Sequence, residues 1–146
     1  DVYGSNCDSY RGKLEDLDSR YAESISADKF DTLVFADRFP FRYLTDDYNI
    51  KYYAAFVGCS AETEADFATV IFLAGKIDEL GLGCIMTIDN SDGKIAQTVS
   101  ENAGTKNLKI LTLDSMQSTT SEDISSGTTY LSIMESNLAV LNEALN

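Results

Sequence analysis

The hydrophobic residues of this chain alternate between helical spacing and short continuous runs. A stripe with spacings of three and four residues runs through the first 26 residues and predicts an amphipathic helix. This stripe consists of Tyr10, Leu14, Leu17, Tyr21 and Ile25. Short apolar runs then recur at about 32–36, 51–56, 84–88 and 108–113, with the length typical of buried strands.

Helical patterns separate these runs. One is expected from Pro40 to about Tyr48, and a longer one from a Ser60 cap to about Leu80. Two more are expected at about 94–103 and from Tyr130 onward, the latter after a structured polar loop over 115–127. Because the crossovers are too long for hairpins, the alternation predicts an α/β fold. The expected architecture is a four-stranded parallel sheet flanked by helices on both faces and preceded by a long N-terminal helix.

Composition narrows the class of protein. A chain of 146 residues suits one domain with a proper core. It carries 24 Asp and Glu against 11 Lys and Arg, a net charge of −13, so it lacks the basic surface that nucleic-acid binding requires. We find no apolar run long enough to span a bilayer, and no signal peptide or lipidation motif in this sequence. We therefore expect no nucleic-acid partner and no membrane segment.

The chain contains no histidine, which excludes Ser/His/Asp and Cys/His catalysis and any His-rich metal cage. Its three cysteines, Cys7, Cys59 and Cys84, match no zinc or redox spacing, and we interpret them as small buried hydrophobes. Whether Cys59 and Cys84 approach one another is left open. A metal site in this chain must therefore be built from oxygen ligands or completed by another chain.

Three of the four predicted strands are followed by an aspartate: Asp37, Asp89 and Asp114. Because parallel strands place their carboxyl ends along one edge of the sheet, these side chains could converge there. Carboxylate oxygens suit hard or borderline divalent cations. The alternative is that each aspartate caps the loop or helix after its strand, as Asp37 would cap the helix near Pro40.

A second acidic group lies at the start of the long helix and consists of Glu62, Glu64 and Asp66. We expect these residues to complement the helix dipole.

Several segments resemble the C-terminal lobe of zinc/manganese-type, adhesin-like ABC-transporter solute-binding lipoproteins (cluster A-I). The resemblance covers nearly the whole chain. Residues 33–48 resemble the family's strand, metal ligand and Phe-x-Tyr-Leu segment, and 58–64 its Gly-x-Ser-Pro-Glu-x-Glu turn, with Ala61 replacing proline. Residues 113–115 look like the acidic end of its last strand. The first helix and the pattern of the final helix are also similar.

The resemblance implies a metal bound between two lobes. Carried over by position, the first ligand of this lobe falls on Asp37, where the family has histidine or glutamate, and the second on Asp114. Asp89 matches an acidic position whose side chain supports the metal ligands without itself contacting the ion. The first segment is one residue longer than the family pattern, so Arg38 is the alternative at the ligand position. We choose Asp37 because an arginine would oppose a cation.

The resemblance also implies an organisation: residues 1–27 as an interlobe linker helix and 28–146 as the C-terminal lobe. The expected function is to bind Zn²⁺ or Mn²⁺ outside the cell and to deliver the ion to an ABC permease. The parent protein is expected to be a cell-surface lipoprotein whose lipid anchor lies outside this chain. The N-terminal lobe is absent, so we expect this chain alone to hold metal weakly. We expect no enzyme activity.

Two alternatives remain: a surface adhesion module that keeps the fold without transporting metal and, with less support, a carboxylate hydrolase.

Overall fold

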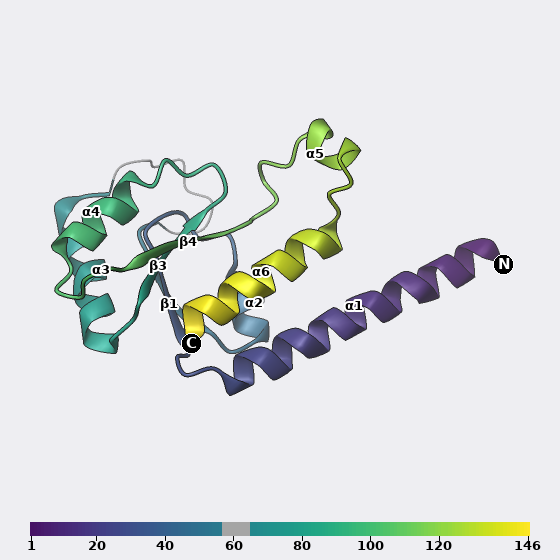
Figure 1. Cartoon of the computed structure of the whole chain (residues 1–146), viewed down its shortest axis with the longest axis horizontal. Coiled ribbons are helices and arrows are strands. Elements are labelled where there is room, and N and C mark those ends of the chain that lie inside the picture. The colour runs from purple at the N-terminus through teal and green to yellow at the C-terminus, as the bar shows by residue number, and fades with distance from the viewer. Residues whose placement is uncertain (57–64) are drawn as a thin grey trace.

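The computed structural model describes residues 1–56 and 65–146, and it is an α/β structure (Figure 1). The elements within these residues are, in chain order, α1 (Val2–Ala27), β1 (Thr32–Phe35), α2 (Arg42–Asp47), β2 (Lys51–Ala54), α3 (Phe67–Leu80), β3 (Cys84–Ile88), α4 (Lys94–Asn102), β4 (Lys109–Leu113), α5 (Ser121–Ser125) and α6 (Tyr130–Leu145).

The four strands form one parallel sheet in the order β2-β1-β3-β4. In the register, Phe35 lies opposite Met86, and Met86 lies opposite Leu111. All residues of β1 and β3 are buried, as expected for the two central strands of a sheet that is covered on both faces. The predicted parallel sheet is therefore confirmed.

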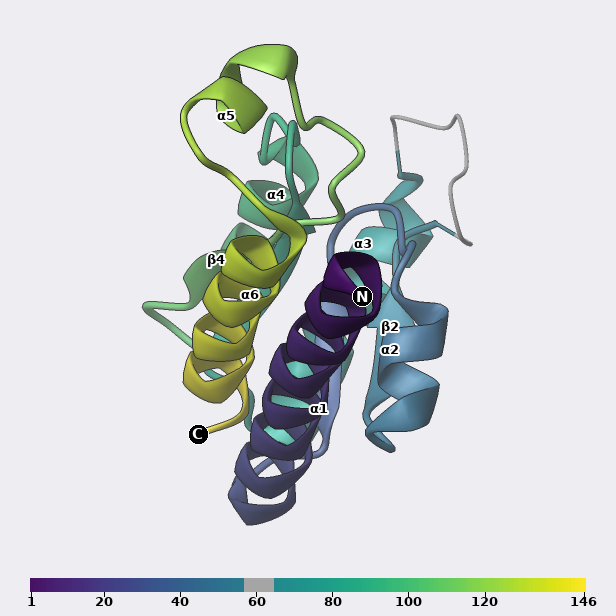
Figure 2. The same ribbon diagram turned by 90° about the vertical axis from the view of Figure 1, so that its right-hand side faces the viewer.

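Alternate residues of the strands supply two hydrophobic cores, one on each face. Phe35 and Met86 contribute to the core that α1 and α6 cover, while Val34 and Ile85 contribute to the core under α3 and α4. Figure 2 shows α1 and α6 running side by side over their face of the sheet. The predicted covering of both faces by helices is confirmed.

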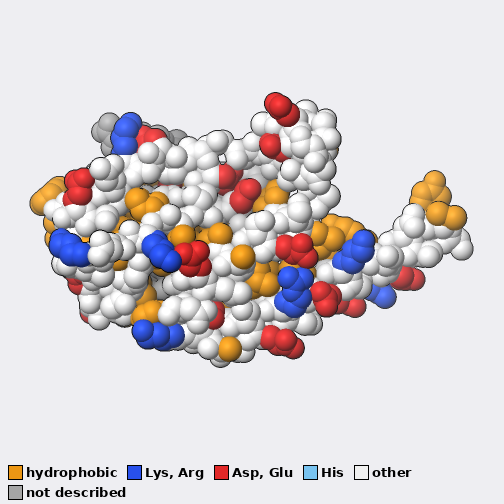
Figure 3. Space-filling view, viewed as in Figure 1, with side chains coloured by type: hydrophobic (Ala, Val, Ile, Leu, Met, Phe, Trp, Pro, Cys, Tyr) orange, Lys and Arg blue, Asp and Glu red, His pale blue; other side chains and the backbone are white. Residues whose placement is uncertain are grey.

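The long helix α1 packs on the core through one face of its second half. Leu17 and Tyr21, from the predicted stripe, are buried, whereas residues 1–13 are exposed. The Tyr21 ring stacks on Tyr48, the C-cap residue of α2, with centroids 5.1 Å apart, and its hydroxyl donates to the Met134 carbonyl of α6. The N-terminal half of α1 extends away from the sheet, and apolar side chains stand at its free end (Figures 1 and 3).

Two predicted helix starts are corrected. The helix expected from Pro40 begins at Arg42, because Phe39 and Phe41 pack against Phe35 and hold this segment on the core. Asp66, expected within the first turns of the long helix, lies at the N-cap of α3 and accepts a hydrogen bond from the Thr69 N–H.

The predicted Ser60 cap, Glu62, Glu64 and Cys59 lie outside the described residues.

The polar loop after β4 contains the short helix α5, which begins with a capping box between Thr120 and Asp123. Of the described cysteines, Cys84 is buried and Cys7 is exposed, and both are free thiols, so the expectation of burial holds for Cys84 alone. In the described part of the chain, we find no helix with the length and apolar character needed to cross a membrane.

Candidate metal site at the carboxyl edge of the sheet

The three candidate aspartates follow β1, β3 and β4 at the same edge of the sheet. Because β3 lies between β1 and β4, the strands that lead to Asp37 and Asp114 are two strand spacings apart, about 10 Å. Asp89 lies on the strand between them. The topology therefore brings the predicted residues to one edge.

Asp37 is almost completely buried, with 7% of its surface exposed. Its Oδ1 accepts a hydrogen bond from the Arg38 N–H at 2.8 Å, so the carboxylate caps its own turn and not helix α2. Its Oδ2 is buried and has no hydrogen-bond donor among the described residues. A buried carboxylate oxygen without a donor is costly. A bound cation would remove that cost, so this atom fits a metal ligand.

Asp89 uses its carboxylate differently. Oδ1 accepts from the N–H and the hydroxyl of Ser115, at 2.7 and 2.6 Å. Oδ2 accepts from the N–H of Ser118 at 3.1 Å and from its hydroxyl. Both oxygens are therefore engaged by the loop that follows β4. This geometry suits a residue that orders the loop beside Asp114.

These hydrogen bonds should make stability depend on pH. Partial burial raises the pKa of Asp89, but the bonds from Ser115 and Ser118 outweigh burial and leave the pKa below its usual value. The carboxylate therefore stabilises the fold above the unfolded pKa of about 3.9, and this contribution is lost as pH falls through the lower folded pKa. We predict that Asp89→Asn lowers the urea midpoint of unfolding at pH 7. Below about pH 4, the midpoint of this variant should decrease less steeply with falling pH than that of the unmodified chain.

The matched control for this experiment is Asp8→Asn on the exposed part of α1, where the carboxylate meets only a loose pair with Arg11 at 3.6 Å. The control should leave the pH profile unchanged. An unaltered profile in Asp89→Asn would show that the loop does not depend on this carboxylate.

Asp114 is held through its backbone. The buried side-chain amide of Asn137 on α6 accepts from the Asp114 N–H at 2.9 Å and donates to the Asp114 carbonyl at 2.8 Å. Asn137 itself is only 2% exposed. Asp114 Oδ1 accepts from the Met116 N–H at 2.7 Å, which closes a local turn. The position of Asp114 is thus fixed by a strand end, its own turn and a neighbouring helix.

The three carboxylates do not gather in one cluster. Asp37 lines a pocket of about 240 Å³ with Asn90, Ser91 and Asp92, while Asp114 lines another of about 320 Å³ between α2 and α6. Among the described residues, no group of three or more carboxylate or thiol side chains could hold an ion. The chain therefore offers separate oxygen ligands along one edge, and further ligands would have to come from elsewhere.

The contacts that hold this edge in place were not predicted from the sequence, although Ser115 and Asn137 lie in segments that resemble the family. Asn137, Ser115 and Ser118 contact the candidate ligands or their loop across 23 to 29 positions in the chain. The one local signal was an asparagine among the apolar residues of the final helix. A polar residue at a buried helical position requires hydrogen-bond partners, but spacing does not identify them.

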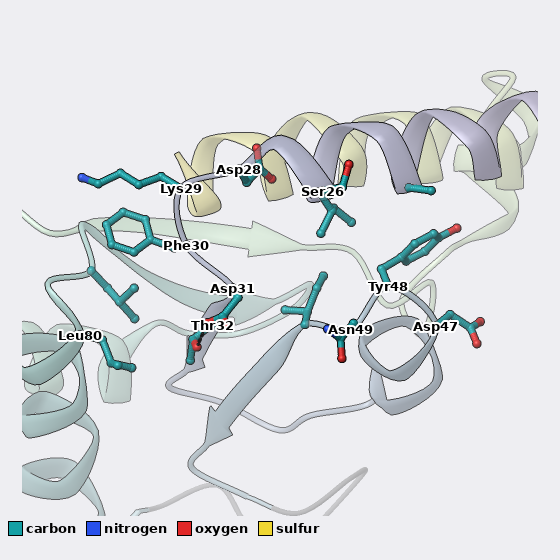
Figure 4. A pocket seen from close by; sticks show the side chains of 14 residues that line it. Ser26, Asp28, Lys29, Phe30, Asp31, Thr32, Asp47, Tyr48, Asn49 and Leu80 are labelled. Carbon is teal, nitrogen blue, oxygen red and sulfur yellow. Dashed lines mark hydrogen bonds between the residues drawn. The ribbon is translucent and has the colours of Figure 1, made fainter.

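A pocket of about 690 Å³ lies at the opposite edge of the sheet (Figure 4). It is lined by the end of α1, the start of β1 and the segment after α2, including Asp28, Thr32 and Asn49. Its position at the amino ends of the strands separates it from the three aspartates.

Comparison with known proteins gives one consistent result. Residues 1–144 match the family described as zinc-uptake complex component A, periplasmic (ZnuA). The chain is 32% identical over 143 residues to the zinc-binding lipoprotein AdcA of Streptococcus pneumoniae, and the aligned region covers 98% of this chain and 28% of that protein. It is 28% identical over 148 residues to the high-affinity zinc uptake system protein ZnuA of Bacillus subtilis, covering 99% of this chain and 44% of that protein.

Solved structures agree with the sequence relatives. The Zn(II)-bound ZnuA-like domain of Streptococcus pneumoniae AdcA superimposes with a TM-score of 0.75 at 31% identity, over 98% of this chain and 52% of that one. The laminin-binding protein Lbp of Streptococcus pyogenes gives a TM-score of 0.81 at 25% identity, over 100% and 54% of the two chains. The chain thus spans about half or less of the length of these relatives.

Proposed function

The chain belongs to the zinc-uptake complex component A family, and we propose that it forms the C-terminal lobe of a solute-binding protein for Zn²⁺ or Mn²⁺. The proposed boundaries are residues 1–27 for an interlobe linker helix and 28–146 for the lobe. The proposed task is to bind the ion outside the cell and pass it to an ABC permease. It involves coordination and release of an ion, without catalytic chemistry.

The proposed ligands of this lobe are Asp37 and Asp114. The observation that carries this assignment is the buried Oδ2 of Asp37, which has no donor in the described part of the chain. Asp89 would support the ligands without contacting the ion, because both of its oxygens already accept hydrogen bonds from Ser115 and Ser118. Two carboxylates leave a four-coordinate zinc ion incomplete. We therefore assign the remaining ligands to a second lobe of the parent protein.

Zinc is the first ion to test. The AdcA relative is named a zinc-binding lipoprotein, and its ZnuA-like domain was crystallised in a Zn(II)-bound form. Manganese remains in the proposal because carboxylate oxygens also suit this harder ion. We further propose a cell-surface location through a lipid anchor outside this sequence.

An adhesion module is the alternative from another class. The structural neighbour Lbp is named a laminin-binding protein. The two proposals differ in the role of the carboxyl edge: metal delivery requires Asp37 and Asp114, whereas adhesion does not.

Titration of the 146-residue chain with ZnSO₄ or MnCl₂ tests the proposal. With two carboxylate ligands and no second lobe, we expect a Kd no tighter than about tens of micromolar, compared with the much tighter binding of complete four-ligand zinc sites. Calorimetry at pH 7 in a non-chelating buffer would measure it, with Asp37→Asn and Asp114→Asn as the matched variants. Nanomolar binding by this chain would refute the need for ligands from a second lobe. Unchanged affinity in both variants would refute the ligand assignment.

A further inference from the structure

Arg38 places a permanent positive charge beside the proposed ligand Asp37. Its Nε lies 3.8 Å from Asp37 Oδ1, and 35% of its side chain is exposed. Both residues line the same pocket, together with Asn90 and Asp92. The guanidinium is charged at any pH the protein would meet. A charge of this sign is unexpected where a cation is to bind.

The two oxygens of Asp37 have different surroundings. Oδ1 accepts the hydrogen bond from the Arg38 N–H, and the guanidinium faces the same oxygen from a distance too long for a hydrogen bond. The backbone therefore orients the carboxylate, while the Arg38 side chain interacts with it through charge. Oδ2 has no donor among the described residues and is the oxygen left for an ion.

Because Asp37 and Arg38 are partly buried, the electrostatic interaction between their charges is strong. Charges that are shielded from solvent are screened less by salt than exposed ones. Before an ion arrives, the guanidinium offsets part of the unfavourable burial of a carboxylate charge. Once a divalent cation sits on Oδ2, the same guanidinium lies a few ångströms from it and repels it.

From this geometry we propose that Arg38 sets the metal affinity of the edge: it is the counter-cation of Asp37 in the free protein and weakens the binding of a divalent ion. This inference rests on the proposed function. It assigns Arg38 a role in release as well, because a bound ion that is repelled from within the site dissociates more readily. Arg38 thus acts on the ion through charge and not as a ligand.

The test compares Zn²⁺ affinity in four forms of the chain by calorimetry, at about 50 and about 300 mM NaCl, a range over which screening changes. Arg38→Gln, which removes the charge, should tighten binding about tenfold. Arg38→Lys, which keeps it, should stay within about twofold of the unmodified chain. The matched control is Arg42→Gln, since this arginine on α2 is 74% exposed and pairs with Asp46. The control should change affinity by less than about twofold.

Several results would overturn the inference. Arg38→Gln could leave affinity unchanged or weaken it, or Arg38→Lys could tighten it as much as the glutamine variant. Arg38→Met, which keeps the apolar stem, replaces the glutamine variant if circular dichroism shows that the latter is misfolded. Failure of the proposed function is a separate outcome, because Asp37→Asn would then bind zinc as well as the unmodified chain does.

Discussion

Replacement of Asp114 by alanine in the complete parent protein is expected to weaken Zn²⁺ binding by more than about 100-fold. Residues that only support a ligand typically contribute about 10- to 100-fold to metal affinity, so loss of a ligand itself should exceed that range. Asn137 holds the Asp114 backbone from both sides, so the truncated side chain leaves the strand end in place. Competition titration against a chelator of known affinity would measure the change.

The comparison variant for this prediction is Asp89→Ala. It removes the carboxylate that accepts the hydrogen bonds from Ser115 and Ser118, so it should loosen the loop and lower the stability of the fold. It should also weaken zinc binding, but by less than the Asp114 variant does. The reverse order of the two effects on affinity would show that the ligand and supporting roles have been exchanged.

The second large effect is expected at Tyr21, which packs α1 against the rest of the fold. Tyr21 is 1% exposed, stacks on Tyr48 and donates to the Met134 carbonyl at 2.5 Å, so one side chain contacts both the C-cap of α2 and helix α6. Tyr21→Ala should lower the free energy of unfolding by about 3–5 kcal/mol, as other large-to-small core changes do. Urea unfolding at pH 7 would measure the loss.

Two variants separate packing from other contributions. Tyr21→Phe keeps the stacked ring and removes only the hydroxyl, so it should cost about 1 kcal/mol. Tyr10→Ala alters the half-exposed ring on the free part of α1 and should cost less than about 0.5 kcal/mol. If Tyr21→Ala costs no more than Tyr10→Ala, α1 is not anchored to the rest of the fold through this residue.

The fold could be predicted well because its main signals are local. Buried central strands produce continuous apolar runs such as the one ending at Phe35, and helices on a core produce stripes such as the one containing Leu17 and Tyr21. The start of α2 was wrong because tertiary packing of Phe39 and Phe41 outweighed the preference of Pro40 for a first helical turn. The short helix α5 was missed although Thr120 and Asp123 have the spacing of a capping box.

The site could be predicted only in part, for a related reason. That aspartates follow three strands is visible in the sequence, and a parallel sheet brings them to one edge. What each carboxylate does depends on partners far away in the chain: Ser115 and Ser118 for Asp89, and Asn137 for Asp114. Hydrogen bonds across such separations leave no periodic signal. The division between a free oxygen on Asp37 and engaged oxygens on Asp89 therefore required the structure.

The four hydrogen bonds that Asp89 receives from Ser115 and Ser118 have a consequence for the entropy of ion capture. Fixing the backbone of one loop residue costs about 1–2 kcal/mol in conformational entropy. A mobile loop would incur that cost each time an ion bound. Here Ser115 and Ser118 are tied down by protein groups alone, so the ordering is completed when the protein folds. An ion arriving at Asp114 would then meet a pre-organised loop, and its rate of capture would be limited by diffusion and dehydration and not by rearrangement of the protein.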